Sequence, residues 1–189
     1  VTTSVGTSYG VDTLFTTASA VASLPRVSIG TQIWSSKNLD VTTYRNGDPI
    51  PQVTDPTQWA NSAPGAWCWY NNDSATYAAI YGRLYNCYAV NDPRGLAPQG
   101  WHVPSDSEWT VLESYLGGSS VAGASMKSVT GWNASNTAGT NSSGLSCLPA
   151  GYRNPDGSFN GLGIIGDFWS STEVSNTSSW FRDLEYSRI

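Results

Sequence analysis

Two short phrases, far apart along the chain, constrain this sequence most. Residues 100–109 read GWHVPSDSEW, and residues 168–173 read FWSSTE. In the first phrase Ser105 and Glu108 fit a capping box, in which the hydroxyl accepts a backbone hydrogen bond and the carboxylate reaches back. We therefore predict a turn that runs into a capped helix, which a Gly-Gly pair ends, and an aromatic-led strand later on. Between them lie Gly- and Asn-rich loops, and this combination favours a rigid extracellular recognition scaffold over an enzyme.

The apolar content is unusual in kind. Nine Trp and ten Tyr stand against four Phe and one Met among 189 residues. Trp and Tyr bury large areas yet carry a polar tip, so they suit loop-rich cores and binding surfaces. Only 12% of the residues are charged, against about 25% in typical domains. The surface is therefore polar through Ser, Thr, Asn and Gly, as is common on secreted and virion-exposed proteins.

Charge and hydropathy exclude two classes of partner. The net charge is -5, and the nine Lys and Arg residues are not clustered. Nucleic acids and anionic membranes require concentrated positive charge, so we predict neither as a partner. No apolar run approaches the roughly 20 residues of a membrane span, so we predict no membrane insertion. The chain opens without Met or a signal peptide, and we expect a processed product or a fragment.

The length predicts one domain with an appended arm. Residues 1–26 are rich in Val, Thr, Ser and Ala, and they favour extended structure. This arm or linker is either a disordered leader or a strand that pairs with another chain, since an unpaired strand offers free backbone donors and acceptors. Residues 27–189 form the domain proper.

The domain is predicted to be α+β, with turn signals between short elements. The elements are a hairpin about Gly30 in 27–34, a strand at 39–44, an Asn-Gly turn at 45–49, a capped helical turn at 54–59, a strand at 66–70, a brief helix at 74–80, a strand at 82–90, the helix from 105, loops through 143, a strand-like stretch at 145–153, a turn at 154–158, and a final hairpin of 168–171 with 180–186.

The catalytic inventory is thin. His102 is the only histidine, and its place at the turn before a helix predicts a local packing or hydrogen-bonding role. If it lined a deep pocket beside an acidic group, that would favour catalysis instead. No carboxylate can be paired with Glu173 from the sequence, so a glycosidase dyad is unsupported. We predict no catalytic residues.

Metal and cysteine signals are also weak. Three Asn- and Asp-rich stretches, at 71–73, 91–92 and 154–156, could offer oxygen ligands to calcium, but none has EF-hand spacing and each is explained as a turn. We predict no metal site and no cofactor. Cys68, Cys87 and Cys147 leave at least one thiol unpaired; either Cys68 bridges Cys87 or the thiols are buried and free.

Seven motifs occur in order: IGTQIWSSKNL at 29–39, YRNGDPIP at 44–51, WCWYNND at 67–73, YGRLYN at 81–86, the phrase at 100–109, LPAGYR at 148–153 and the phrase at 168–173. Together they resemble the Fibrobacter succinogenes major paralogous domain, a family of surface and secreted modules of Fibrobacteres and Bacteroidetes that is also met in phages. The resemblance covers roughly residues 27–186. It implies a C-type lectin-like fold, akin to formylglycine-generating-enzyme-like domains and retroelement variable proteins, with a small twisted antiparallel sheet, about two helices and long irregular loops.

Two departures from the family concern the cysteines and the chain end. Relatives continue into a last strand containing Gly-x-Ser-Val-Arg-Cys, whereas this chain stops at Ile189. We expect that strand to be missing from this sequence or supplied by another chain. Cys87 stands where relatives often have Trp, so a bridge to Cys68 would be particular to this protein.

The resemblance implies a non-catalytic extracellular, cell-surface or virion-surface adhesion module that recognises a glycan or a receptor. Trp132 and Tyr152 are predicted to supply stacking area on the loop face, with Arg153 and Asn154 adding directional hydrogen bonds, whereas the indoles of residues 101, 109 and 169 are predicted to be core. The alternative is a structural component, such as a phage capsid decoration, fibre or filament subunit, that assembles through residues 1–26. A minor alternative is a formylglycine-generating-type enzyme, whose reactive cysteine site near the chain end is absent here.

Overall fold

The structure, a computed structural model, describes residues 24–61, 64–133 and 139–187. Only residues 24–26 of the predicted arm are among the described residues. Both interpretations of the arm therefore stay predictions. Within the described residues the first element is strand β1 (Arg26–Ile29), which pairs antiparallel with β2 (Gln32–Ser35). The predicted hairpin about Gly30 is confirmed, and its turn requires the φ of +59° that glycine adopts freely.

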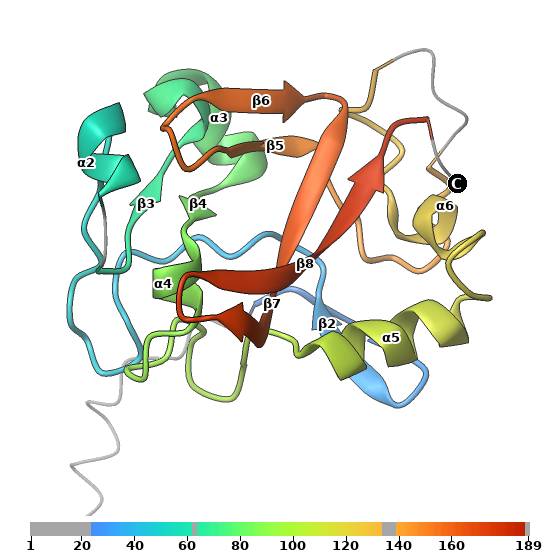
Figure 1. Cartoon of the computed structure of the whole chain (residues 1–189). Helices are drawn as coiled ribbons and strands as arrows, with labels where there is room; N and C mark the ends of the chain where they lie inside the picture. The colour runs from blue at the N-terminus through green and yellow to red at the C-terminus, as the bar shows by residue number, and fades with distance from the viewer. Residues whose placement is uncertain (1–23, 62–63, 134–138, 188–189) are drawn as a thin grey trace, which may run out of the picture.

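A four-stranded sheet carries most of the regular structure. Its order is β6 (Phe159–Leu162), β5 (Ala150–Arg153), β7 (Ile165–Ser175) and β8 (Ser178–Glu185). The pairs β5–β6 and β7–β8 are antiparallel, and β5 meets β7 in parallel at Gly151 and Gly166. A two-residue ladder joins β3 (Trp67–Cys68) to β4 (Leu84–Tyr85) beside this sheet (Figure 1).

The described helices are short. They are α2 (Pro56–Ala60), the 3₁₀-helix η2 (Tyr70–Asn72), α3 (Ser74–Tyr81), α4 (Cys87–Val90), α5 (Asp106–Tyr115) and α6 (Ala122–Met126). Only α3 and α5 have eight residues or more, whereas about two helices in all were predicted. The α+β class is confirmed, and the C-type lectin-like assignment stays a prediction. Among the described helices, none is long and apolar enough to cross a bilayer.

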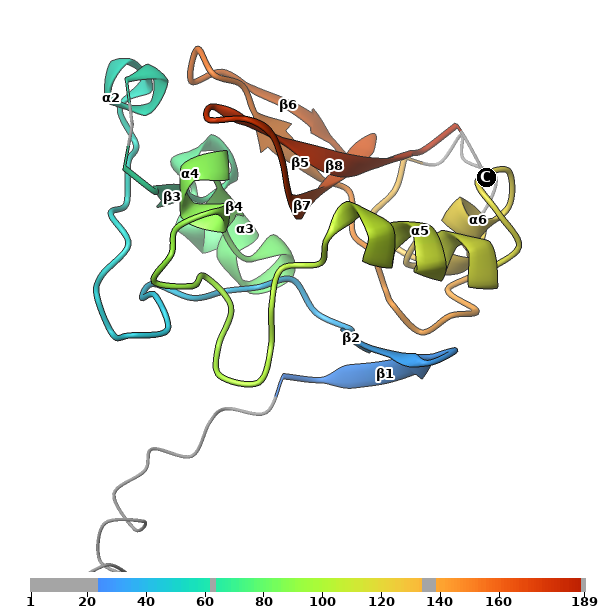
Figure 2. The same cartoon turned by 60° about the horizontal axis from the view of Figure 1, so that its bottom comes forward.

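The largest apolar core lies between α5, the β1–β2 hairpin and the sheet. Trp34 of β2 and Trp109 of α5 are both buried there, with ring centroids 4.7 Å apart, and Leu112 and Leu184 pack beside them. Figure 2 shows α5 between the hairpin on one side and β7–β8 on the other. Helix α5 begins where predicted because both halves of its capping box form, from Ser105 and from Glu108.

Several other predicted elements are confirmed. Asp55 caps α2 by accepting from the backbone of Gln58, and Asp73 caps α3. The Asn-Gly turn forms with Gly47 at φ +94°, and the final hairpin is β7–β8, longer than predicted.

Three predicted elements are wrong. Residues 39–44 are not a strand, because Tyr85 takes the place of a neighbouring strand: its hydroxyl both accepts from Val41 N–H and donates to Val41 C=O, each at 2.7 Å. The strand at 82–90 stops after Tyr85, because Asn86 caps α4 by accepting from Ala89 N–H. Helix α6 interrupts the stretch that was predicted to be loop.

The capping box gives a direct test of why α5 begins at Asp106. Ser105→Ala should lower the free energy of unfolding by about 1 kcal/mol, since the backbone N–H of Glu108 loses its acceptor. Urea denaturation measures the change. Ser114→Ala, on the exposed side of the same helix, should stay within about 0.5 kcal/mol of wild type. Equal losses in both variants would show that the cap contributes nothing.

Candidate functional site

A cleft of about 1130 Å³ opens between the β1–β2 hairpin and the four-stranded sheet. Its walls come from the hairpin, the stretch 81–85, the loop 96–104, the β5 region and the strands β7 and β8. Figure 2 shows the hairpin and the sheet on opposite sides of the molecule. Small-molecule sites usually measure about 300–1,000 Å³, so this cleft has room for a ligand of several rings.

The sheet presents five side chains to the cleft from one face. Asp167 of β7 lies opposite Asp183 of β8, and Trp169 lies opposite Phe181. Side chains alternate along a strand, so these four share a face. Tyr152 joins them, because its neighbour Gly151 pairs in parallel with Gly166, the residue before Asp167. All five line the cleft, and so does Phe168, which points to the other face of β7.

The carboxyl group of Asp167 is electrostatically unusual. Burial, and to a smaller extent the nearby charge of Asp183, together raise its pKa to about 7. Like charges opposite each other on a sheet are unfavourable, and desolvation favours the neutral acid. Near neutral pH, Asp167 is therefore partly protonated, and it can both donate to and accept from a ligand's polar groups.

Aromatic contacts fix the floor and the opposite wall. The Trp169 indole N–H donates to the carbonyl of Tyr85 at 2.8 Å, which ties β7 to β4, and its ring meets Phe181 edge-on at 6.2 Å. Across the cleft, the Arg83 guanidinium lies 4.4 Å from the ring centroid of Trp67 and pairs with Asp40. Both walls are thus held by contacts that involve buried or half-buried rings.

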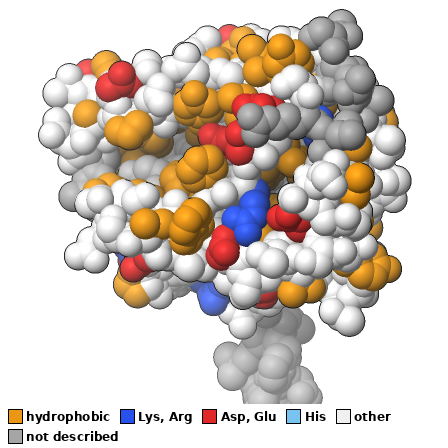
Figure 3. Space-filling view, turned by 45° about the vertical axis from the view of Figure 1, so that its right-hand side comes forward, with side chains coloured by type: hydrophobic (Ala, Val, Ile, Leu, Met, Phe, Trp, Pro, Cys, Tyr) orange, Lys and Arg blue, Asp and Glu red, His pale blue; other side chains and the backbone are white. Residues whose placement is uncertain are grey.

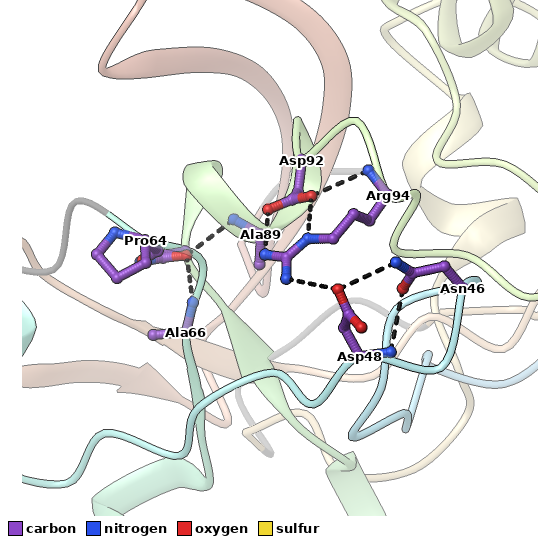
Figure 4. A network of polar contacts seen from close by, with 8 residues as sticks. Asn46, Asp48, Pro64, Ala66, Ala89, Asp92 and Arg94 are labelled. Carbon is purple, nitrogen blue, oxygen red and sulfur yellow. Dashed lines mark hydrogen bonds and ion pairs between the residues drawn. The ribbon is translucent and has the colours of Figure 1, made fainter.

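Two arginines position the loop that forms another wall. Arg45 donates to the carbonyls of Ala97 and Trp101, at 3.1 and 2.7 Å. Arg94 binds Asp92 with two nitrogens and Asp48 with a third, as Figure 4 shows. The Arg94 hydrogen bond lowers the pKa of Asp92, so this pair stays ionised at neutral pH. The network is structural, because its charged groups pair with one another.

His102 and Glu108 lie at the mouth of the cleft. The imidazole Nε2 is 2.8 Å from Glu108 Oε1, and the other carboxylate oxygen accepts from Ser105 N–H. The local hydrogen-bonding role predicted for His102 is confirmed. Both residues line the cleft, but the imidazole side chain is 68% exposed, so it lies at the rim and not in a deep pocket.

The three indoles predicted to be core differ in placement. Trp109 is buried, and Trp169 is half-buried and packs against a core cluster, as predicted. Trp101 is half-buried and lines the cleft, so its assignment to the core is wrong. The loop that carries it is held through its backbone carbonyl by Arg45, which leaves the ring free to contact the cleft.

The four predicted ligand-binding residues separate into two places. Tyr152, Arg153 and Asn154 all line the cleft. Trp132 does not: it is half-buried against the first core, and its indole N–H donates to Ser128. It therefore does not share the cleft with the other three. A binding role for each of the four stays a prediction.

Arg153 is already engaged by the protein. Its three guanidinium nitrogens donate to the carbonyls of Gly157, Val53 and Thr54, at 3.0, 2.6 and 2.9 Å. The same group lies 4.5 Å from the ring centroid of Trp59. This side chain clasps the β5–β6 turn to the segment before α2, and Tyr152 is the better candidate for ligand contact.

The stretches considered for calcium have other partners. Asp73 caps α3, Asp92 binds Arg94, and Asp156 accepts from Ser158 within its turn. In the part of the chain that the structure describes, no group of three or more His, Cys, Asp or Glu could hold a metal ion.

All three cysteines are free thiols, so no bridge joins Cys68 to Cys87. Burial raises the pKa of Cys68 to about 11 and that of Cys147 to about 12, which makes both inert.

The sequence reasoning missed Asp167, Phe181 and Asp183. A signal was present, because alternate residues of a predicted hairpin share one face. If the odd-numbered positions of both strands share one face, that face carries the carboxylates of Asp167 and Asp183 and the rings of residues 169 and 181. The pairing register, which aligns the two carboxylates, could not be read from the sequence because bulges follow Trp169.

Comparison with protein families gives one match. The family model described as Fibrobacter succinogenes major domain covers residues 27–188. Comparison with curated proteins and with solved structures gives no match.

The raised pKa of Asp167 predicts a pH dependence of stability. An unfolded Asp has a pKa near 3.9, so between about pH 4 and pH 7 the folded state binds more protons, and stability falls as the pH rises. Asp167→Asn should remove this fall and add on the order of 2 kcal/mol at pH 8, about half the full linkage because the carboxyl keeps some solvent contact. Urea denaturation at pH 4 and pH 8 measures it.

Asp183→Asn provides the matched variant. It should keep most of the pH dependence, because burial is the larger cause of the Asp167 shift. If the stability difference between wild type and Asp167→Asn is the same at both pH values, the assignment of the raised pKa fails.

Proposed function

The chain belongs to the Fibrobacter succinogenes major domain family, and we propose that it is a non-catalytic binding module that holds a glycan in its cleft. Such a module would act outside the cell, on a cell or virion surface, as an adhesion or receptor-binding protein. The observation that carries the proposal is the cleft face on which Trp169 and Phe181 adjoin Asp167 and Asp183.

The residue types on this face suit a sugar. Apolar faces of sugar rings pack against aromatic rings, and carboxylates accept hydrogen bonds from hydroxyl groups. Tyr152 and Trp101 add two further rings to the lining of the cleft. A mainly apolar cleft with a few convergent polar groups is the usual form of a small-ligand site.

The cleft is also preformed, which favours binding. Its walls are fixed by Trp169, Arg83 and Arg45 through the contacts described above. A site whose walls are already ordered loses little conformational entropy when a ligand enters. On the face seen in Figure 3, basic side chains lie beside acidic ones, and they form no patch that would suit a polyanion.

Adjacent residues of β8 provide a matched test. Phe181 lines the cleft and is 49% exposed, whereas Trp180 points to the other face of the strand and is 52% exposed. A glycan array of the full chain identifies a ligand, and calorimetry measures its affinity. Phe181→Ala and Trp101→Ala should each weaken binding by roughly tenfold or more, the loss of one stacking ring. Trp180→Ala should leave the affinity unchanged.

Two results would contradict the proposal. One is a folded protein that binds nothing on the array; the other is equal weakening by Trp180→Ala and Phe181→Ala. Shortening of the bound glycan, lost in Asp167→Asn, would assign acid–base chemistry to the Asp167–Asp183 pair and make the module a hydrolase.

A further inference from the structure

Strand β8 ends the four-stranded sheet, and among the described residues its other backbone edge pairs with no strand. An end strand of this kind offers a row of donors and acceptors to another extended segment. Natural proteins blunt such edges with charges, yet the first half of β8, from Ser178 to Phe181, carries none. Within that half Ser179 is buried and accepts from Asn91, so the exposed part of the edge is at Trp180 and Phe181.

The second half of β8 is engaged by the protein itself. Arg182 donates to Asp106 of α5 at 2.6 Å, and Asp183 faces the cleft. Leu184 is buried in the first core. The first half differs, because Trp180 and Phe181 are about half exposed on opposite faces of the strand. An added strand along this half would cover part of both rings.

Residues 1–23 of the sequence have the composition of such a strand. They are rich in Val and Thr, they contain Tyr, Leu and Phe, and Asp12 is their only charged residue. Val and Thr favour extended structure. At about 3.3 Å per residue they can span roughly 75 Å, whereas the first half of β8 needs a partner of only about four residues. Apart from Asp12, this segment is uncharged, as is the first half of β8.

On one molecule, the start of the described chain and strand β8 lie apart. The described chain begins at Leu24, which lines the cleft beside β1, and Figure 2 shows β1 and β8 on opposite sides of α5. To pair with β8 of its own molecule, a segment that starts beside β1 has to cross from one side of the domain to the other. A second copy placed head to tail brings its β8 to that side, and a head-to-tail contact that does not close produces open chains of copies.

We propose that residues 1–23 of one copy add as a strand to the free edge of β8 in the next copy, so that the protein assembles head to tail. The interaction is β-augmentation: backbone hydrogen bonds give affinity, and Trp180 gives a contact for alternate side chains. A test through Trp180 does not touch the cleft, because Trp180 lies on the other face of β8 from Phe181.

Sedimentation equilibrium of the full chain over a wide concentration range tests the proposal. The mean mass should rise above the 20.2 kDa of one chain as concentration increases. Trp180→Lys should weaken association by roughly tenfold or more, because a lysine at an edge strand disfavours strand addition. Val5→Lys should do the same from the other partner, without touching the described domain.

The controls make each outcome decisive. Val111→Lys, on α5 and also 50% exposed, should associate like wild type. A synthetic peptide of residues 1–23, added to the full chain, should lower the mean mass by capping β8. A chain that stays at 20.2 kDa throughout, or association that Trp180→Lys leaves unchanged or that Val111→Lys weakens equally, overturns the proposal. A monomer whose residues 1–23 are protected from protease by its own β8 also overturns it.

Discussion

Indole and guanidinium N–H groups supply the hydrogen bonds that the irregular backbone of this protein does not make with itself. Buried backbone carbonyls need a donor, and an unpaired one costs about 1–3 kcal/mol. The carbonyls of Ile50, Tyr85 and Trp169 each accept from a Trp indole. Arg45 and Arg153 hold five more carbonyls between them. The high Trp content therefore has a second use beyond area burial, because the indoles of Trp67, Trp109 and Trp169 bring donors for backbone carbonyls into the core.

These bonds explain why a cleft can persist in a protein with so little regular structure. The loop 96–104 and the stretch 81–85 make few ladder bonds, yet each is tied to a neighbouring element by a side chain that is itself packed. The sheet then needs to provide only one ordered face, on which Asp167 and Asp183 lie among aromatic rings. Those two carboxyl groups lie opposite each other on neighbouring strands. Burial and the charge of Asp183 raise the pKa of Asp167. Strongly shifted pKa values of this kind are common at functional sites.

Local chemistry decided which parts of this structure could be predicted from the sequence. The α+β class, the capped helix at Ser105 and the hairpin turns follow from residues close together in the chain. The strand expected at 39–44 failed because its partner is one hydroxyl, that of Tyr85, which no local pattern reveals. Of the predicted site, Tyr152, Arg153 and Asn154 line the cleft, but Arg153 already donates to three carbonyls, and Trp132 packs against the core outside the cleft. The floor of the cleft depends on a strand register, which tertiary contacts determine.

A pair of Trp→Phe variants tests most directly whether indole N–H donors hold the fold. Trp169→Phe keeps an aromatic ring but leaves the carbonyl of Tyr85 without its donor. Trp34→Phe removes a similar volume at a more buried position, where the indole donates only to the Gln32 side chain. If donation to backbone carbonyls is what matters, urea denaturation will show Trp169→Phe less stable than Trp34→Phe by about 1 kcal/mol or more. If buried area alone matters, Trp34→Phe will be the less stable of the two, and the account will be contradicted.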